Sequence, residues 1–205
     1  GPLAGRYELP LLGEHNLRNG LAALAVAWAS GVPAADLQAR LARVAAPRLR
    51  WAEVELFDGR VRWIEDAYNA NPASMKAALT AFRQHAGASR RLLVLGSMSE
   101  LGAASADYHR QLADNAQTVE PTLCVFVGEE ARPAYERAAE LGLRTTLVPN
   151  AAASADALAA ELLPGDAVLL KGSRSVALET AQVTIRSRQA SIEASWRGEA
   201  ARLVA

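Results

Sequence analysis

Short apolar runs alternate with amphipathic segments through the second half of the chain, and this alternation constrains the fold more than any other feature. The apolar runs are 91–96, 122–128, 144–149 and 166–172, and the segments with helical periodicity are about 73–86, 104–118, 130–141 and 154–163. Continuous apolar strands separated by helices are typical of a parallel sheet with both faces covered. Because such crossovers are right-handed, the pattern predicts an α/β fold with a Rossmann-like, mainly parallel sheet of about six strands and helices on both faces.

The chain before these strands has a helical pattern. Residues 16–29 and 34–45 both show apolar side chains at helical spacing, so we expect two helices there. The first helix should pack through Leu21, Leu24 and Val26 or their neighbours. A small helical segment therefore precedes the predicted sheet.

A hairpin signal marks the change from helices to strands. Two strand-like runs flank Asp58-Gly59, a dipeptide that is typical of a two-residue hairpin turn. We therefore expect three parts in the chain: a helical segment over 1–47, an α/β domain over 48–180 and a helical tail over 181–205.

The tail carries apolar residues at helical spacing. These residues are Ile185, Ile192, Trp196 and Leu203. Such a stripe indicates a helix that packs either on the domain or on a partner, and packing on the domain is the favoured interpretation.

Charge and composition exclude several classes of function. The chain has 205 residues with 22 basic and 22 acidic side chains, so it has no basic excess for binding nucleic acid. No apolar stretch approaches the roughly 20 residues that span a bilayer, and no secretory signal is present, which predicts a cytoplasmic protein without a membrane span. The single cysteine, Cys124, lies in an apolar run, so we predict a buried strand residue and neither an internal disulfide nor a cysteine-based metal site.

Polar side chains gather at three predicted strand ends, which are the places where parallel sheets collect ligands. The three loops read EDAYNANP (65–72), GSMSELG (96–102) and KGSR (171–174). In the first loop, Asn71 is a good helix N-cap, and the proline after it suits a first helical turn. Capping does not explain Asp66, Tyr68 or Asn69, so a ligand site and a purely structural role both remain open at this point.

The other two loops have structural interpretations as well. Glu100 lies between two glycines, where a solvated turn is favoured over a substrate contact, and a lone helical histidine such as His109 is more often a surface or capping residue. The third loop does not match a phosphate-binding loop, in which the lysine follows the second glycine. We interpret Ser173 as the cap of a helix whose N-terminus, with Lys171 and Arg174, attracts an anion such as a carboxylate.

Taken together, four segments resemble the Mur ligase family. GEHNLRNGLAALAVA (13–27) is similar to the segment that closes the central ATP-binding domain of these ligases. EDAYNANPASMKAAL (65–79), LGSMSELGAASADYH (95–109) and LLKGSRSVALE (169–179) are similar, in the same order, to the C-terminal domain of the member that adds D-alanyl-D-alanine. The resemblance covers roughly residues 11–180.

The resemblance implies an ATP-driven ligase of peptidoglycan synthesis. In the family reaction, the carboxylate of UDP-N-acetylmuramoyl-tripeptide is phosphorylated to an acyl phosphate, and the amine of D-alanyl-D-alanine attacks it with loss of phosphate. ATP and Mg²⁺ are the implied cofactors, and the Mg²⁺ and triphosphate sites are expected outside this chain. The resemblance implies that residues 1–47 are the C-terminal end of the central ATP-binding domain. The implied N-terminal domain and the phosphate-binding loop of the central domain are missing, so we expect a fragment of a longer enzyme that is inactive alone.

The resemblance implies nucleotide contacts at two places before the first loop. At the start of the first expected helix, His15, Asn16 and Asn19 match a motif whose asparagines lie beside the adenine. At the start of the α/β domain, Arg50, or alternatively Arg48, matches an arginine that reaches the ATP phosphates.

The strand-end loops are implied to contact the ribose and the peptide substrates. Asp66 matches an acid that contacts the ribose, and Tyr68 is its neighbour. The residues implied to face the peptide or dipeptide are Asn69, Asn71, Glu100, His109, Lys171, Ser173 and Arg174. No metal ligand is implied within this chain.

A second hypothesis is a non-catalytic docking module of the same fold that binds other cell-wall synthesis proteins. The apolar stripe of the tail is its main support, whereas the intact NANP and KGSR sequences favour the enzyme. Ser97 departs from the family pattern, because it stands where the family usually has an acid. A free-standing dinucleotide oxidoreductase is excluded, since no GxGxxG sequence follows a predicted strand.

Overall fold

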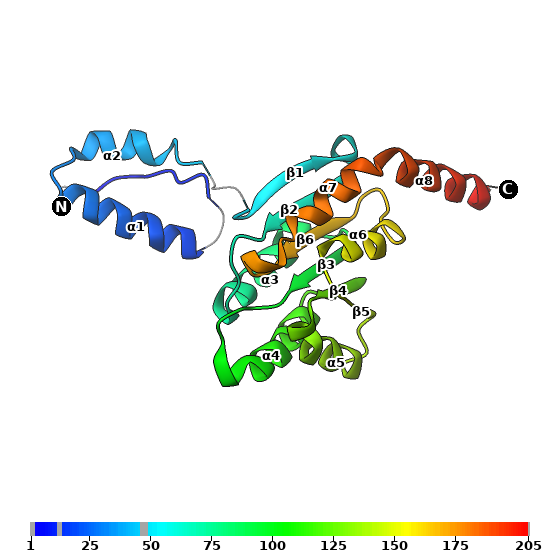
Figure 1. Cartoon of the computed structure of the whole chain (residues 1–205). Helices are drawn as coiled ribbons and strands as arrows, with labels where there is room; N and C mark the ends of the chain where they lie inside the picture. The colour runs from blue at the N-terminus through cyan, green and yellow to red at the C-terminus, as the bar shows by residue number, and fades with distance from the viewer. Residues whose placement is uncertain (1–2, 12–13, 46–48, 205) are drawn as a thin grey trace. The chain divides into compact units, whose positions relative to one another are not determined.

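The structure is a computed structural model that describes residues 3–11, 14–45 and 49–204 (Figure 1). The chain divides into two compact units, Gly1–Arg48 and Leu49–Ala205. The first unit contains the two predicted helices, α1 (Glu14–Ala29) and α2 (Ala34–Leu41), but α2 ends at Leu41 and not at residue 45 as predicted. The predicted domain boundary, between residues 47 and 48, lies outside the described residues.

The first unit buries only part of the apolar surface of α1. Leu24 of α1 and Leu37 of α2 are buried, as expected for helices that pack on each other. Leu21 and Val26, however, are 58% and 68% exposed. The prediction that α1 packs through these residues is therefore right for Leu24 and wrong for Leu21 and Val26.

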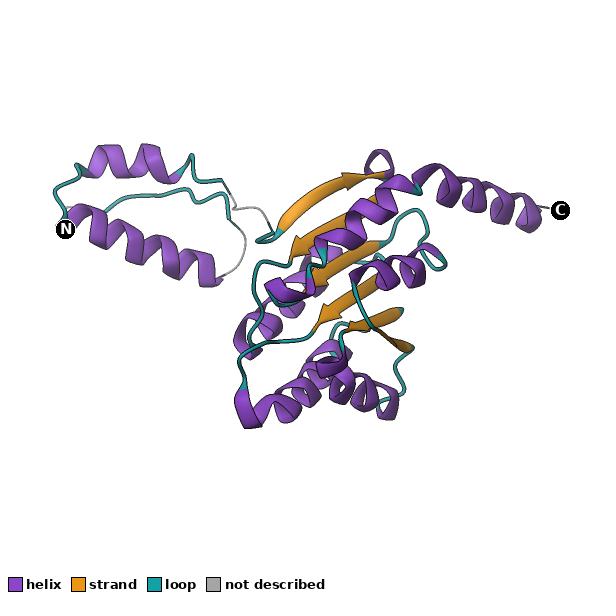
Figure 2. Cartoon of the chain, viewed as in Figure 1, coloured by secondary structure: helices purple, strands orange, loops and turns teal. Residues whose placement is uncertain are grey.

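The second unit is built on one six-stranded sheet with the order β1-β2-β6-β3-β4-β5 (Figure 2). The strands are β1 (Ala52–Leu56), β2 (Val61–Asp66), β3 (Arg91–Gly96), β4 (Leu123–Val127), β5 (Thr145–Val148) and β6 (Ala167–Lys171). β1 pairs with β2 in antiparallel fashion, and the other four pairings are parallel. The predicted mainly parallel α/β sheet is confirmed.

Helices cover both faces of this sheet. They are α3 (Pro72–Ala86), α4 (Ser105–Gln117), α5 (Arg132–Glu140), α6 (Ala151–Ala159), α7 (Glu179–Ser187) and α8 (Gln189–Val204). The buried side chains of α3, α4 and α5 belong to one core cluster, and those of α6, α7 and α8 belong to another. Strand residues alternate between the clusters, which explains why the strands read as continuous apolar runs.

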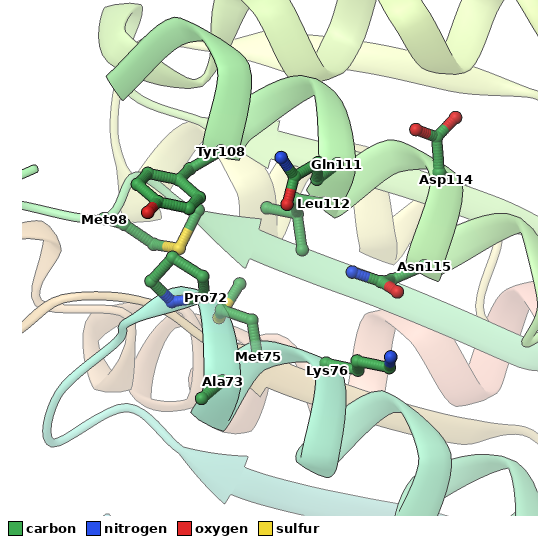
Figure 3. A pocket seen from close by; sticks show the side chains of 10 residues that line it. All are labelled: Pro72, Ala73, Met75, Lys76, Met98, Tyr108, Gln111, Leu112, Asp114 and Asn115. Atoms are coloured by element: carbon green, nitrogen blue, oxygen red, sulfur yellow. The ribbon is translucent and has the colours of Figure 1, made fainter. Parts of the chain in front are cut away.

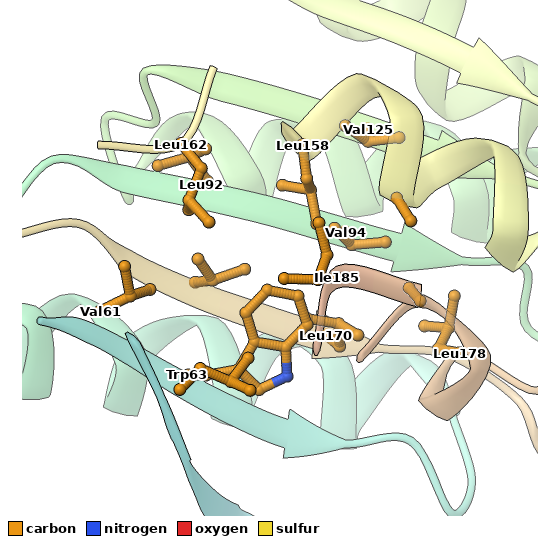
Figure 4. Close-up of a cluster of buried hydrophobic side chains, with 14 of the residues drawn as sticks. Val61, Trp63, Leu92, Val94, Val125, Leu158, Leu162, Leu170, Leu178 and Ile185 are labelled. Atoms are coloured by element: carbon orange, nitrogen blue, oxygen red, sulfur yellow. The ribbon is translucent and has the colours of Figure 1, made fainter. Parts of the chain in front are cut away.

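Figure 4 shows part of the core on the α6–α8 face. Trp63 of β2, Val94 of β3 and Leu170 of β6 contribute to this cluster together with Leu158 of α6 and Ile185 of α7. Each of these five side chains is at most 1% exposed. Burial of this apolar surface is the main favourable term for the fold.

Two local features differ from the sequence-based expectation. β1 and β2 are joined by Phe57–Arg60, a connection of 3₁₀ form in which Phe57 and Asp58 also have positive φ, rather than by a two-residue turn. Helix α6 begins at Ala151 instead of about residue 154, because the side chain of Asn150 accepts a hydrogen bond from the Ala153 amide at 3.0 Å. Neither difference alters the order of the elements.

The C-terminal tail packs on the second unit. Ile192 and Trp196 of α8 are buried and belong to the same cluster as the sheet. The Trp196 ring lies 4.8 Å from the Phe57 ring, and its indole N–H donates to the Leu162 carbonyl. This contact supports the favoured interpretation of the tail as a packing helix, although the side chain of Leu203 lies outside the described residues.

Two further expectations concern single elements. Cys124 is fully buried in β4, as predicted, and this burial raises the pKa of its thiol far above the ordinary value. None of the helices that the structure describes combines the length and apolar character needed to cross a membrane.

Candidate functional site

The site that the sequence predicts lies at the carboxyl ends of three adjacent strands. β6 pairs with β2 on one side and with β3 on the other, so the loops that follow these strands are neighbours. The register places Asp66, at the end of β2, opposite Lys171, at the end of β6. Figure 1 shows this edge of the sheet, where the chain leaves β2 towards α3 and β3 towards α4.

Asp66 and Lys171 form an ion pair inside this edge. The Lys171 Nζ lies 2.7 Å from Asp66 Oδ2, and it also donates to the Asp66 carbonyl at 3.4 Å and to the Asn69 carbonyl at 3.2 Å. Lys171 is 1% exposed, whereas the Asp66 side chain is 21% exposed. The lysine therefore binds the loop after β2 from the buried side, and the Asp66 side chain is partly exposed to solvent.

Arg50 and Tyr68 lie together at the start of the second unit. The Arg50 guanidinium carbon lies 4.3 Å from the centre of the Tyr68 ring, which is a cation–π contact. The Tyr68 amide donates to the Leu49 carbonyl at 3.0 Å, and this hydrogen bond holds the two segments side by side. Both Arg50 and Tyr68 are exposed, so their polar ends are accessible to a ligand. The alternative candidate, Arg48, lies outside the described residues.

Asn71 caps α3, as its sequence context predicts. Its side-chain oxygen accepts from the Ser74 amide at 2.9 Å, and Ser74 Oγ accepts from the Asn71 amide at 3.1 Å. The side-chain oxygen of Asn69 accepts from the Ala70 amide at 2.8 Å. Both asparagines therefore support the loop, and both are exposed.

His109 is a buried support for the loop after β3. The Met98 amide donates to His109 Nε2 at 3.0 Å, so the neutral ring carries its proton on Nδ1, which donates to the Ser105 carbonyl at 2.8 Å. The ring is 0% exposed. The interpretation of His109 as a surface or capping residue is therefore wrong, and neither ring nitrogen is open to a ligand.

Ser173 joins the loop after β6 to the loop after β3. Its Oγ accepts from the Ser99 amide at 2.8 Å, its own amide donates to the Ser97 carbonyl at 3.1 Å, and Ser99 Oγ lies 3.1 Å from Ser175 Oγ. Ser97, the residue that departs from the family pattern, is buried here. Ser99 and Ser175 were not among the predicted site residues, although serines in loops that follow neighbouring strands are a visible signal of such a contact.

The prediction that Ser173 caps a helix is wrong. Only a three-residue 3₁₀ turn, Arg174–Val176, follows it, and α7 begins later, at Glu179. No side-chain cap hydrogen bond is made by Ser173. The predicted anion site at a helix N-terminus is therefore not formed here, because a single turn aligns too few peptide dipoles.

Arg174 and Glu100 are the charged side chains that face outward from the two loops. Arg174 pairs with Glu179 and has a side chain that is 56% exposed. Glu100 is exposed and adopts a left-handed backbone conformation with φ of 64°. Neither is held by buried groups, so both side chains can reorient towards a ligand.

The candidates in the first unit lie on α1. Asn16 and Asn19 are three residues apart and therefore share one face of the helix. Asn19 is exposed and Asn16 is half-buried. The side chain of His15 lies outside the described residues.

A pocket of about 320 Å³ lies between α3 and α4 (Figure 3). Met75, Met98 and Leu112 line its inner part, and Lys76 and Tyr108 lie at its margin. Among the described residues, none of the predicted site residues lines this pocket. Within the same residues, no group of three or more histidine, cysteine, aspartate or glutamate side chains could hold a metal ion.

Comparison with known proteins identifies the class of this domain. The family model of the Mur ligase glutamate ligase domain matches residues 48–174, which is more than half of the chain. The chain therefore belongs to the Mur ligase family.

Curated relatives of the chain include two proteins of the same name from different bacteria. UDP-N-acetylmuramoyl-tripeptide–D-alanyl-D-alanine ligase from Treponema pallidum is 34% identical over 90% of this chain and 40% of its own length. The enzyme of the same name from Mycobacterium tuberculosis (strain CDC 1551) is 37% identical over 83% of this chain and 38% of its own length. The chain thus spans about 40% of the length of these curated relatives.

Solved structures agree with this assignment. A crystal structure of MurF from Acinetobacter baumannii superposes with a TM-score of 0.78 at 29% identity, over 88% of this chain and 40% of that one. MurF from Thermotoga maritima, solved in complex with ADP, superposes with a TM-score of 0.70 at 22% identity, over 88% of this chain and 40% of that one. The second likeness concerns the fold alone.

Proposed function

We propose that this chain is the C-terminal part of an ATP-dependent ligase that joins D-alanyl-D-alanine to UDP-N-acetylmuramoyl-tripeptide in peptidoglycan synthesis. The observation that carries the proposal is the arrangement at one sheet edge. Asp66 offers a partly exposed carboxylate, Arg50 is stacked on Tyr68, and Arg174 faces outward from the neighbouring loop. The names of the relatives supply the two peptide substrates.

The nucleotide fits the first part of this edge. Lys171 binds Asp66 Oδ2, and no described residue donates a hydrogen bond to Oδ1, so this oxygen can accept one from a ribose hydroxyl. The exposed guanidinium of Arg50 can donate hydrogen bonds to a phosphate oxygen. Because stacking on Tyr68 already restricts the Arg50 side chain, less conformational entropy is lost on binding. On α1, Asn16 and Asn19 are the proposed adenine contacts, together with His15.

We propose that Mg²⁺ and the triphosphate are held by domains of the full-length protein that correspond to the parts of the relatives not spanned by this chain. When bound, ATP supplies the phosphoryl group that converts the tripeptide carboxylate into an acyl phosphate, with release of ADP. The residues of this chain would orient the ribose and one phosphate and then exclude water from the acyl phosphate. The dipeptide amine forms the new C–N bond, loses a proton and displaces phosphate.

The dipeptide is proposed to bind beside the loops after β3 and β6. The guanidinium of Arg174 can leave Glu179 and donate two hydrogen bonds to the terminal carboxylate of D-alanyl-D-alanine. Glu100, which is exposed, is the acid that can face the dipeptide amine, and the amides of Asn69 and Asn71 face the same edge. The buried Lys171, Ser173 and His109 can contribute only through the loops that they hold.

The docking alternative loses its main support. Ile192 and Trp196, which supplied the apolar stripe of the tail, are buried against the second unit and are not available to a partner.

A kinetic experiment on the full-length protein tests the proposal. Arg174→Ala should raise the KM for D-alanyl-D-alanine about tenfold and leave the KM for ATP within about twofold, since one charged hydrogen-bonding partner is lost. Arg144→Ala is the matched control, because Arg144 is also an exposed arginine paired with a glutamate (Glu161), and it precedes β5 at the opposite edge of the sheet. Unchanged dipeptide kinetics in Arg174→Ala would contradict the assigned role, and a full-length protein without ligase activity would contradict the function.

The chain alone is proposed to be inactive. The sequence has no GxxxxGK(S/T) phosphate-binding loop, and the described residues include no group of side chains that could hold a metal ion. The remaining contacts must offset the lost freedom of ATP, so its affinity should be about millimolar or weaker. Calorimetry with ATP and Mg²⁺, followed by a phosphate-release assay with both peptide substrates, measures this. Micromolar binding or steady turnover would show that the chain holds a complete site.

A further inference from the structure

The ammonium group of Lys171 has no donor left for a ligand. An ammonium has three N–H groups, and Lys171 Nζ has three acceptors within hydrogen-bond reach: Asp66 Oδ2 at 2.7 Å, the Asn69 carbonyl at 3.2 Å and the Asp66 carbonyl at 3.4 Å. The side chain is also 2% exposed. A substrate carboxylate could bind this group only if it replaced one of these three acceptors.

All three acceptors belong to the loop after β2. Two of them are backbone carbonyls at either end of the segment 66–69, and the third is the carboxylate of Asp66 itself. Lys171 therefore fixes both the path of this loop and the side-chain orientation of Asp66. Its contact is with Oδ2, whereas no described residue donates to Oδ1, and the Asp66 side chain is 21% exposed.

Ser173 makes the corresponding contact on the other side of β6. Its Oγ accepts from the Ser99 amide, and its own amide donates to the Ser97 carbonyl, so two hydrogen bonds hold the loop after β3. The backbones of Gly172 and Gly96 are also in close contact. A Cβ atom added to Gly172 would lie only 2.9 Å from the Gly96 Cα. Only residues without a side chain allow this approach.

We propose that Lys171 and Ser173 are positioning residues rather than substrate ligands: Lys171 sets the loop that carries Asp66, and Ser173 sets the loop that carries Ser99 and Glu100. The strand order β2-β6-β3 makes this division possible, because the segment after β6 lies between the two loops. Arg174 is then the residue of this segment that remains for a ligand. The identity of the ligands rests on the proposed function, but the division of roles does not.

Amide hydrogen exchange on the 205-residue chain tests the division directly. In Lys171→Met, the amides of residues 67–70 should exchange about tenfold faster or more, because the contacts that hold this loop are lost, and the Ser99 amide should be unchanged. In Ser173→Ala, the Ser99 amide should exchange faster by a similar factor, and residues 67–70 should be unchanged. Each variant is the control for the other.

Three outcomes would overturn the proposal: unchanged exchange of residues 67–70 in Lys171→Met, unchanged exchange of Ser99 in Ser173→Ala, or the same acceleration of both loops in both variants. Should Lys171→Met fail to fold, Lys171→Gln keeps an amide donor of intermediate length and should accelerate residues 67–70 by a smaller factor. Ser173→Ala removes one hydroxyl and tests the other half of the proposal independently.

Kinetics of the full-length protein separate positioning from direct binding. Lys171→Met should raise the KM for ATP about tenfold, through Asp66, and leave the KM for D-alanyl-D-alanine within about twofold. A rise in the dipeptide KM alone would show that Lys171 binds the dipeptide and would overturn the proposal. If the full-length protein is not a ligase for these substrates, the proposed function fails, while the exchange result still decides whether Lys171 and Ser173 position the loops.

Discussion

Two helices of equal length, α1 and α8, differ in how far their apolar side chains are buried. α1 and α8 each contain 16 residues and carry apolar side chains at helical spacing. α8 buries Ile192 and Trp196 against the sheet unit, whereas in α1 Leu21 is 58% exposed and Trp28 is 46% exposed.

The difference teaches what an apolar stripe can and cannot predict. Periodicity shows that one face of a helix is apolar, but the partner of this face depends on residues that are distant in the sequence. The partner of α8 is Phe57 in the β1–β2 connection, which is 139 positions before Trp196, and the Leu162 carbonyl. A sequence pattern alone does not contain this pairing.

The largest expected effect on the free energy of unfolding comes from replacing the tryptophan of each helix by alanine. Trp196→Ala should lower the free energy of unfolding of the sheet unit by about 3 kcal/mol, because a buried ring and its contact with Phe57 are lost. Trp28→Ala should change it by less than about 0.5 kcal/mol, as is usual for an exposed position. Urea unfolding followed by far-UV circular dichroism measures both.

Equal losses in the two variants would remove the contrast between the helices. A small loss in Trp196→Ala would show that α8 does not pack on the sheet in solution. Phe57→Leu is a useful second variant, because it keeps a buried apolar side chain and removes only the aromatic partner of Trp196.

An intermediate effect is expected for the charged rim of the α8 contact. Arg60 pairs with Glu193 at 2.6 Å and lies 5.3 Å from the Trp196 ring centre. Since the Arg60 side chain is 43% exposed, Glu193→Gln should cost only about 0.5 kcal/mol, and the cost should fall in high salt. Unfolding at two salt concentrations, with Arg40→Ala on α2 as the control, checks this. A cost that does not depend on salt would contradict an electrostatic origin.

The smallest effect concerns the turn at residues 162–166, whose Leu162 carbonyl accepts the hydrogen bond from Trp196. Burial raises the pKa of Asp166, while the Leu163 amide and Arg90 act in the opposite direction. Because the folded pKa lies above the unfolded one, the contribution of this group is favourable below the unfolded pKa and is lost as the pH rises through the folded pKa.

Asp166→Asn, which keeps an oxygen for the Leu163 amide, should therefore gain stability relative to the wild type as the pH rises through the folded pKa of Asp166. Urea midpoints at several pH values measure this gain, with the exposed Asp107→Asn as the control. A difference that stays constant with pH would assign the effect to packing and not to the charge.

Most of the fold could be predicted from the sequence. The four apolar runs correspond to β3, β4, β5 and β6, since strands buried on both faces have a continuous local signature. The cap at Asn71 was also predictable, because both of its partners lie within three residues. The β1–β2 connection was not, because Phe57 adopts a left-handed conformation that a bulky aromatic residue does not favour.

The candidate site was predictable in place but not in detail. The polar loops do lie at the ends of adjacent strands, as the parallel sheet requires. The partners inside the site were not predictable, since Lys171 and Asp66 are 105 positions apart and Ser173 and Ser99 are 74 apart. Charge alone made Lys171 and Arg174 look equivalent, and burial separates them.

The burial of Lys171 also makes this chain convenient for chemistry in the laboratory. The sequence contains only two lysines, Lys76 and Lys171, and Lys76 is exposed on α3. An amine-directed dye should therefore attach, apart from the chain's own α-amino group, to a single side chain. Mass spectrometry of the labelled, folded chain should find one modified lysine, so fluorophores or surface linkers can be placed at Lys76 without disturbing the strand-end loops.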